Sequence, residues 1–231
     1  MKKLLLILLC LPFIGFGQDD ISSEFYFSIA KINHSNGEYQ IAIVDYTEAI
    51  KIDPDFYEAY LNRGVIYDEL GDYKNAIADY TEAIKINPDD ADAYYNRGNT
   101  YKSLEKYKDA IADYTRAIKL DPYYTVVFVN RGNTYQKLEN YKNAIADYTE
   151  AVKIDPDNAD AYYNRGFAYQ KLENYKNSIA DYTEAIKINP DNADAYDGRG
   201  TTKWYLRLDF CSDYKRACNL GLCINYKNLC K

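Results

Sequence analysis

The sequence predicts an all-α protein, an α-solenoid of stacked antiparallel helical hairpins. Three observations predict this fold. Prolines recur at a fixed step of 34 positions, at Pro54, Pro88, Pro122, Pro156 and Pro190. Glycines keep the same step, at Gly64, Gly98, Gly132, Gly166 and Gly200. Between these markers each unit carries two stripes of small and aromatic residues at helical spacing. A fixed period of about 20–50 residues indicates a stacked repeat architecture and not one closed core.

The unit from residue 91 to residue 124 shows how one hairpin is built. Tyr94, Gly98 and Tyr101 are three or four residues apart and therefore share one face of a first helix. The stripe of the second helix consists of Ala110, Ile111, Tyr114, Ala117 and Ile118. Pro122 ends this helix because proline lacks an N–H and clashes with the preceding turn. One hairpin cannot bury both stripes, so about three stacked units are needed for stability.

Most tyrosines belong to this stacking. Of the 27 tyrosines, 20 fall in the four columns of Tyr94, Tyr101, Tyr107 and Tyr114. These columns coincide with the helical stripes, so we expect core positions with phenol oxygens near the rim of each layer.

The order Tyr94, Gly98, Tyr101, Ala110, Tyr114, Ala117 and Pro122 resembles the tetratricopeptide repeat (TPR) family. Tyr94 stands in the column that is usually Trp, and Tyr114 stands in the column that is usually Phe. The resemblance extends over nearly all of residues 23–220, and it implies a right-handed superhelix whose first helices line the concave side. Arg97 departs from the family, which generally has Leu there, and the other units repeat this departure.

The first residues resemble a secretory signal peptide. Residues 1–17 combine two lysines, an apolar stretch and the small residues of Gly15-Phe16-Gly17 before a cleavage point. As a membrane anchor the stretch is short and contains Pro12. A lipoprotein signal is disfavoured because Leu9 precedes Cys10. We therefore expect an exported bacterial protein, periplasmic or secreted, with no membrane insertion of the mature chain.

The remaining chain is expected to divide at the repeat period. The first repeat is degenerate, and so is the shortened sixth, because terminal repeats have one face in water. His34, the single histidine, is expected at the surface. The expected segments are a linker 18–22, repeats 23–56, 57–90, 91–124, 125–158, 159–192 and 193–220, and a disulfide-stapled capping helix 221–231.

Each repeat carries charged residues next to its buried stripes. The arginines are Arg63, Arg97, Arg131, Arg165 and Arg199, and the aspartates are Asp45, Asp79, Asp113, Asp147 and Asp181. An unpaired charge there would cost several kcal/mol, whereas a hydrogen-bonded pair is tolerated. Asp45 has no arginine in its own unit, which favours pairing between units, Arg63 with Asp45 and Arg97 with Asp79. We expect a structural ladder of ion pairs without a catalytic role.

Four cysteines are concentrated at the end of the chain, at Cys211, Cys218, Cys223 and Cys230. Cysteines seven residues apart on one helix are about 10 Å apart, too far for a disulfide. A helical hairpin turning near Gly221 would place Cys218 opposite Cys223 and Cys211 opposite Cys230. We predict these two bridges, one of three possible connectivities, in an oxidising compartment. A zinc site is the alternative, but paired short spacings are absent, so no metal is expected.

The resemblance implies that residues off the core stripes of the first helices face the concave groove. They are Tyr95, Asn96, Asn99, Val129, Asn130, Asn133, Tyr163, Asn164 and Phe167, with Lys102, Lys137 and Lys171 toward the far edge. An asparagine side chain can bind a peptide backbone because it both donates and accepts hydrogen bonds, and the aromatic rings supply apolar contact. Alternatively, the asparagines bridge neighbouring repeats.

One binding mode known in the family is disfavoured. Its pocket for a terminal carboxylate needs a lysine in the column that here holds Asp92, Asp160 and Asp194. Binding of chaperone tails therefore does not fit this sequence.

Enzyme chemistry has little support, because the sequence shows no nucleophile elbow, phosphate loop or metal cluster. The net charge of −7 and the lack of a basic cluster argue against nucleic acid as a partner. We expect no cofactor. The leading hypothesis is a scaffold that binds a peptide segment or a partner helix of another protein in its concave groove. The alternative is a structural or assembly component that self-associates in the cell envelope.

Overall fold

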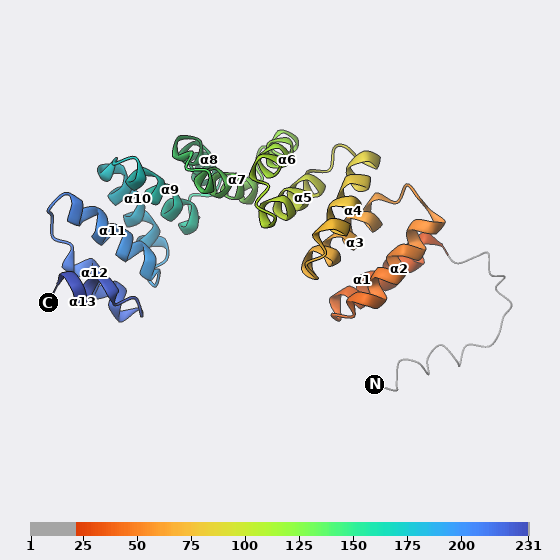
Figure 1. The fold of residues 1–231 in the computed structure, drawn as a ribbon, viewed down its shortest axis with the longest axis horizontal. Helices are drawn as coiled ribbons and strands as arrows, with labels where there is room; N and C mark the ends of the chain where they lie inside the picture. Colours follow the sequence, from red (N-terminus) through yellow and green to blue (C-terminus); the bar gives the residue numbers. More distant parts are fainter. Residues whose placement is uncertain (1–21, 231) are drawn as a thin grey trace, which may run out of the picture. The chain divides into compact units, whose positions relative to one another are not determined.

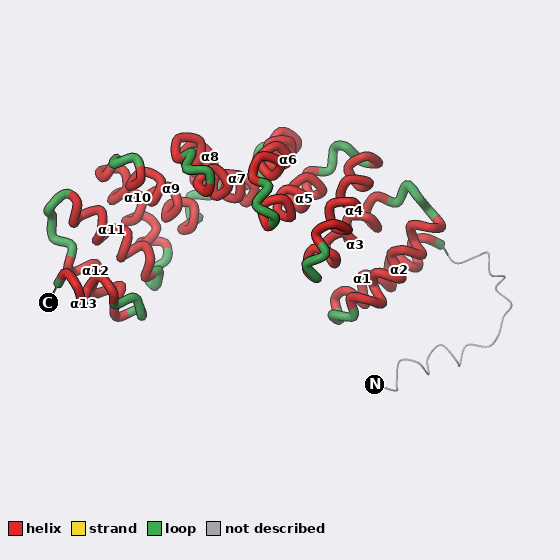
Figure 2. Tube along the Cα trace, viewed as in Figure 1, coloured by secondary structure: helices red, strands yellow, loops and turns green. Residues whose placement is uncertain are grey.

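The computed structural model describes residues 22–230, and this part of the chain consists of helices joined by short loops, without strands (Figures 1 and 2). The expected signal peptide 1–17 lies outside the described residues, as do residues 18–21 of the expected linker. None of the helices in the described part is long and apolar enough to cross a membrane.

The chain forms two compact units that divide after Pro88. The described part of unit 1 contains the helices α1 (Ser23–Ser35), α2 (Tyr39–Ile52), α3 (Tyr57–Glu69) and α4 (Tyr73–Ile86). Unit 2 contains α5 (Ala91–Ser103), α6 (Tyr107–Leu120), α7 (Thr125–Lys137), α8 (Tyr141–Ile154), α9 (Ala159–Lys171), α10 (Tyr175–Ile188), α11 (Ala193–Tyr205), α12 (Cys211–Asn219) and α13 (Ile224–Leu229). Odd-numbered helices up to α11 are the first helices of their hairpins, and even-numbered ones are the second helices.

The turn inside each hairpin uses one residue with a left-handed backbone. Gly37 and Gly71 take this position in unit 1, with φ of 76° and 75°. Glu105, Glu139 and Glu173 take it in unit 2, with φ of 58°, 56° and 57°. Only glycine adopts this conformation without a steric penalty. The left-handed position recurs with the repeat period of 34 residues. Where it is occupied by glutamate, the geometry of the hairpin imposes a steric cost on the backbone.

From the second repeat on, a buried tyrosine in the second helix explains the glycine of the first helix; in the first repeat this position is Ala30. Tyr114 and Tyr148 are fully buried, with 0% exposure. A Cβ atom on Gly98 would lie 2.8 Å from Cε1 of Tyr114, and one on Gly132 would lie 2.7 Å from Cε1 of Tyr148. The ring therefore occupies the space of the missing side chain, and the two helices of a hairpin can approach closely.

The arginine ladder pairs within repeats, so the expectation of Arg63 with Asp45 and of Arg97 with Asp79 was wrong. Arg63 donates from Nε and Nη2 to both oxygens of Asp79, at 2.8 and 2.7 Å. Asp45 instead accepts a hydrogen bond of 2.7 Å from Nδ2 of Asn33. The equivalent pairs are Arg97–Asp113, Arg131–Asp147, Arg165–Asp181 and Arg199–Asp213.

The physical reason is the geometry of the hairpin. Residues separated by 16 positions, such as Arg63 and Asp79, face each other across one pair of antiparallel helices. The remaining nitrogen of the guanidinium reaches back to the preceding repeat, where Nη1 of Arg63 donates to Thr47 at 2.9 Å. Arg131, Arg165 and Arg199 make the same bond, to Thr115, Thr149 and Thr183. These arginines therefore do connect neighbouring repeats, but through a threonine and not through an aspartate. Arg199 pairs with Asp213 at a separation of 14 because the last repeat is two residues shorter.

Two disulfides close the end of unit 2. Cys211 is bonded to Cys230 and Cys218 to Cys223, the connectivity expected from the spacing. The Cα atoms of Cys211 and Cys230 are 5.6 Å apart. The helix after the turn, α13, has only six residues, so the bridges fix it against α12.

Candidate functional site

The first helices of unit 2 form one continuous layer. Each contacts the first helix of the next repeat, α5 with α7, α7 with α9 and α9 with α11, more extensively than the second helices contact one another. Figure 1 shows α6 and α8 along one edge of this unit and α5 and α7 along the other. The more crowded layer lies on the inner side of a curved stack. We call the surface of α5, α7 and α9 the first-helix face.

A hydrogen-bonded network joins α5 to α7 on this face. Nζ of Lys102 donates to Oδ1 of Asn130 at 3.0 Å. Nδ2 of Asn130 lies 3.2 Å from the hydroxyl of Tyr95 and 3.4 Å from Oδ1 of Asn99. The same Oδ1 accepts a hydrogen bond of 2.7 Å from the buried Tyr114 hydroxyl. Asn99 and Asn130 therefore bridge neighbouring repeats, the alternative that the sequence left open.

Other asparagines of the face keep hydrogen-bonding capacity. The side chains of Asn96 and Asn164 make no hydrogen bond to any group within residues 22–230. Asn133 accepts from the Tyr148 hydroxyl at 2.7 Å through Oδ1, and within the same part of the chain its Nδ2 donates to no group. Half-buried amides of this kind can pair with the backbone of a bound segment.

A pocket of about 460 Å³ lies where α5, α7 and α9 come together. It is lined by Lys102, Ser103, Tyr107, Asn133, Gln136, Lys137 and Asn164. The lining contains two ammonium groups and three amides but no carboxylate, so it favours ligand groups that accept hydrogen bonds or carry negative charge.

Lys102 is a half-buried cation of this pocket. Desolvation lowers its pKa from the ordinary lysine value. Its ammonium donates to the amide oxygen of Asn130 and has no carboxylate partner within residues 22–230. An acceptor from a ligand would therefore stabilise the charged form of a group that the protein alone leaves partly desolvated.

An apolar strip lies beside the pocket on the same face. The Tyr163 ring centroid is 5.7 Å from that of Tyr182, and burial raises the pKa of Tyr163. Nζ of Lys171 lies 5.1 Å from the ring centroid of Phe167. Together with the half-buried Val129, these side chains offer apolar contact area next to the amides.

The structure thus gathers some of the predicted residues and separates others. Asn133 and Asn164 line the pocket with Lys102 and Lys137. The residues that do not line it are Tyr95, Asn96, Asn99, Val129, Asn130, Tyr163 and Phe167.

Sequence reasoning missed three of the lining residues, Ser103, Tyr107 and Gln136. Tyr107 was expected in the core stripe but is half-buried and borders the pocket. Gln136 follows Asn133 by three residues and therefore shares its helix face. Extending the asparagine column by one helical turn would have found Gln136.

Two family models match the chain. The model described as TPR repeat matches residues 30–71, 66–104 and 132–173. The model described as Tetratricopeptide repeat matches residues 91–124 and 159–192. A comparison with curated proteins gave no match.

Solved structures of TPR proteins share the fold. YrrB is 23% identical with a TM-score of 0.70, over 80% of this chain and 98% of its own. A TPR protein from Parabacteroides merdae is 20% identical with a TM-score of 0.71, over 86% of this chain and 77% of its own. The C-terminal part of a TPR repeat-containing protein from Cytophaga hutchinsonii is 18% identical with a TM-score of 0.74, over 84% and 78%.

Proposed function

The chain belongs to the tetratricopeptide repeat family, whose members are generally non-enzymatic scaffolds for protein–protein interaction, and from this premise we propose that it binds a peptide segment of a partner protein. The segment lies across the first-helix face of unit 2. Its anchor is the pocket that contains Lys102, Asn133, Lys137 and Asn164.

The observation that carries this proposal is the set of amides without partners. Asn96 and Asn164 make no side-chain hydrogen bond within the described part of the chain. A peptide in extended conformation exposes alternating N–H and C=O groups, which such amides can pair with. The ammonium groups of Lys102 and Lys137 complement carbonyl or carboxylate oxygens of the same segment. An extended segment fits this chemistry better than a partner helix, whose backbone groups are already paired.

The apolar strip formed by Val129, Tyr163 and Phe167 supports the same position for the bound segment. Tyr163 and Phe167 lie on α9 next to Asn164, so a bound segment would meet aromatic area beside the amide. Rings of this kind contribute much of the contact energy of protein interfaces at a low entropic cost. Among the similar solved structures, YrrB is a TPR protein with an unusual peptide-binding site.

We also propose that the protein acts after export from the cytoplasm. The features of residues 1–17 support this location, and so does the pair of disulfides in unit 2, because such bonds persist in oxidising compartments.

Selection from a peptide library displayed on phage tests the proposal. We expect selected peptides to bind the protein and to lose at least about tenfold in affinity with Asn164→Ala/Lys137→Ala, which removes one amide and one charge. Neither side chain has a partner in a hydrogen bond or ion pair within residues 22–230, so the variant should fold normally. Lys176→Ala, on the exposed side of α10, is the matched control. If both variants bind the peptides equally well, the first-helix face is not the binding surface.

A further inference from the structure

One side of α1 in unit 1 is exposed although it is largely apolar. This side carries Phe25, Ser28 and Ile32, and we call it the N-terminal face. Phe25 and Ile32 are 51% and 58% exposed, and Ser28 between them is exposed as well. The three residues are three or four positions apart and therefore share one face of the helix. Terminal repeats ordinarily present a polar outer face to water, so an apolar stripe here indicates an interaction surface.

In every later repeat the columns of Phe25 and Ile32 are buried. The first column continues in Ala59, Ala93, Val127, Ala161 and Ala195, and the second continues in Ile66, Thr100, Thr134, Ala168 and Thr202, all 0% exposed. These side chains pack against the second helix of the preceding repeat. Ala59 and Ile66, for example, belong to one cluster with Tyr46 of α2. The N-terminal face is thus built like a surface between two repeats, but within residues 22–230 no helix precedes it.

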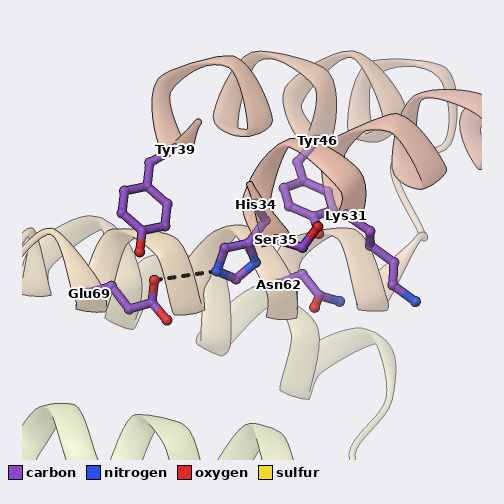
Figure 3. A pocket seen from close by; sticks show the side chains of 7 residues that line it. All are labelled: Lys31, His34, Ser35, Tyr39, Tyr46, Asn62 and Glu69. Atoms are coloured by element: carbon purple, nitrogen blue, oxygen red, sulfur yellow. Dashed lines mark hydrogen bonds and ion pairs between the residues drawn. The ribbon is translucent and has the colours of Figure 1, made fainter. Parts of the chain in front are cut away.

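The opposite side of α1 is occupied by the second repeat. In Figure 3, His34 of α1 points toward Glu69 of α3, and Nε2 of the histidine lies 3.3 Å from a carboxylate oxygen. Both residues line a pocket of about 410 Å³ between α1, α2 and α3. His34 and Ile32 are two positions apart and therefore lie on opposite sides of a helix with 3.6 residues per turn. The N-terminal face accordingly points away from the second repeat.

A further copy of this chain offers no exposed second-helix stripe that could cover the N-terminal face. The buried tyrosine of the second helix is 0–2% exposed in each hairpin, from Tyr46 to Tyr214. This includes the last hairpin, where α13 packs against α12 and Asn225 donates to Asp197 of α11 at 2.7 Å. Head-to-tail stacking of copies is therefore blocked at the disulfide-closed end. What remains for the N-terminal face of one copy is the N-terminal face of another.

The stripe is complementary to itself when two copies of α1 cross in antiparallel orientation. Phe25 and Ile32 are equally far from the centre of the stripe, which falls at Ser28 and Ile29. Phe25 of each copy would therefore meet Ile32 of the other. The interaxial distance of two packed helices depends on the side chains at their contact, and the small Ser28 at the crossing point lets the helices approach closely.

The charges beside the stripe favour the same orientation. Glu24 and Lys31 are exposed, form no ion pair within residues 22–230, and lie on one flank of the stripe because they are seven positions apart. Like flanks meet in an antiparallel helix pair, so Glu24 of each copy would lie near Lys31 of the other. In a parallel pair these charges would meet the opposite flank, where Ile29 and Asn36 are uncharged. Flanking charges of this kind set the orientation of paired helices.

We propose that the protein forms a two-fold symmetric dimer through its N-terminal face, with α1 of the two copies packed antiparallel. A two-fold interface closes on itself, so assembly stops at the dimer. Each copy contributes one helix of 13 residues. Such a contact is small among specific interfaces, so we expect a dissociation constant on the order of 10 μM. The dimer goes beyond the proposed function because it concerns unit 1 and uses none of the residues of the first-helix face.

Sedimentation velocity of the purified protein tests the dimer at concentrations from about 1 to 100 μM. We expect the mass to double as the concentration rises through this range. Phe25→Asp/Ile32→Asp should stay monomeric throughout, because a dimer would bury unpaired carboxylates. Both side chains are exposed in the monomer, so circular dichroism should show unchanged helicity. Tyr123→Asp, at a residue of unit 2 that is 79% exposed, is the matched control and should dimerise like the unaltered protein.

Charge reversal tests the antiparallel arrangement. Glu24→Lys brings like charges together at both ends of the contact, and so does Lys31→Glu. Each variant alone should therefore dimerise at least about tenfold more weakly. An equimolar mixture of the two variants should form a mixed dimer about as strong as the original one, because opposite charges then meet at both ends. Glu24→Lys/Lys31→Glu, which exchanges the two charges within one chain, should dimerise normally.

Several outcomes would overturn the dimer. A protein that is monomeric at every concentration would do so, and would leave residues 1–21 or another protein as the cover of the N-terminal face. Larger oligomers, a dimer that survives Phe25→Asp/Ile32→Asp, or a mixture that associates no better than its two components would also contradict it. Asn164→Ala/Lys137→Ala leaves the N-terminal face intact and should not change the mass, so the result is separate from that of the proposed function.

Discussion

Arg131 donates hydrogen bonds to both carboxylate oxygens of Asp147, from Nε at 2.9 Å and from Nη2 at 2.7 Å. Its Nη1 donates to the Thr115 hydroxyl of the preceding repeat at 2.9 Å. One guanidinium thereby joins three helices, α6, α7 and α8. The Arg131 and Asp147 side chains are 15% and 6% exposed. The pair is therefore buried within its own hairpin, where breaking it leaves a desolvated charge.

Removing one partner of this pair should be strongly destabilising. We expect Asp147→Ala to lower the free energy of unfolding by about 3–5 kcal/mol, because Arg131 would remain buried without its counter-charge. Glu150→Ala removes an exposed pair with Lys153 on the same helix and should cost less than about 1 kcal/mol. Urea unfolding followed by circular dichroism measures both. Equal losses in the two variants would contradict the structural role of the ladder.

The contact between glycine and tyrosine should decide the effect of an added methyl group. A Cβ at Gly132 would lie 2.7 Å from the Tyr148 ring, whereas one at Gly166 would lie 3.2 Å from the Tyr182 ring. Alanine gains up to about 1 kcal/mol in helix propensity, but overpacking costs about 1–3 kcal/mol. We expect Gly132→Ala to be the more destabilising of the two variants in urea unfolding. A more stable Gly132→Ala protein would show that the helices do not approach as closely as described.

At the left-handed positions of the turns, a change to glycine should stabilise the fold and a change from glycine should destabilise it. Glu139 has φ of 56°, so Glu139→Gly should raise the free energy of unfolding by up to about 1 kcal/mol. Gly71, at the same place in its own hairpin, has φ of 75°, and Gly71→Glu should lower it by a similar amount. Thermal unfolding of both variants checks the pair of signs. Two changes of the same sign would refute the explanation.

Stability should fall steeply at alkaline pH. Burial raises the pKa of Tyr46 from 10.0 to about 12 and raises those of Tyr80, Tyr114, Tyr148 and Tyr182 further. The folded state therefore keeps protons that the unfolded state loses near pH 10, and linkage makes stability decrease as pH rises above that value. This contribution is fully present below pH 10 and is lost progressively above it.

Ultraviolet absorbance of tyrosinate measures this effect directly. One group of the 27 tyrosines should ionise while the helical signal is intact, and the buried group should ionise only as the protein unfolds. Ionisation of all tyrosines in one step, with helicity unchanged, would contradict the burial of this column.

Much of the fold follows from the periodic residues, because each imposes a local constraint. Pro122 ends a helix, and Gly98 leaves space for the buried ring of Tyr114 in the second helix. Hairpins and their stacking could therefore be predicted. The partner of Arg63 could not, because choosing between Asp45 and Asp79 requires the distance across the hairpin. Asp213, the partner of Arg199, was missed for a different reason: the last repeat is two residues shorter, so the separation of this pair is 14 and not 16.

The candidate site was less predictable than the fold. The first-helix columns gave Asn133 and Asn164, but spacing does not show that Asn99 and Asn130 are already engaged by Tyr114 and Lys102. In the first repeat, Lys31 replaces the asparagine found at Asn99 and Asn133. That substitution is visible in the sequence, but only the structure shows that it leaves the Tyr46 hydroxyl without an acceptor.

Site-specific photo-cross-linking tests the central proposal most directly. A benzoylphenylalanine placed by Asn164→p-benzoylphenylalanine lies in the pocket of the first-helix face, and one placed by Lys142→p-benzoylphenylalanine lies at an exposed position of the second helix α8. With a peptide selected for binding, we predict cross-linking from position 164 and none above background from position 142. Cross-linking from position 142 with none from position 164 would place the docking surface on the opposite layer and contradict the account.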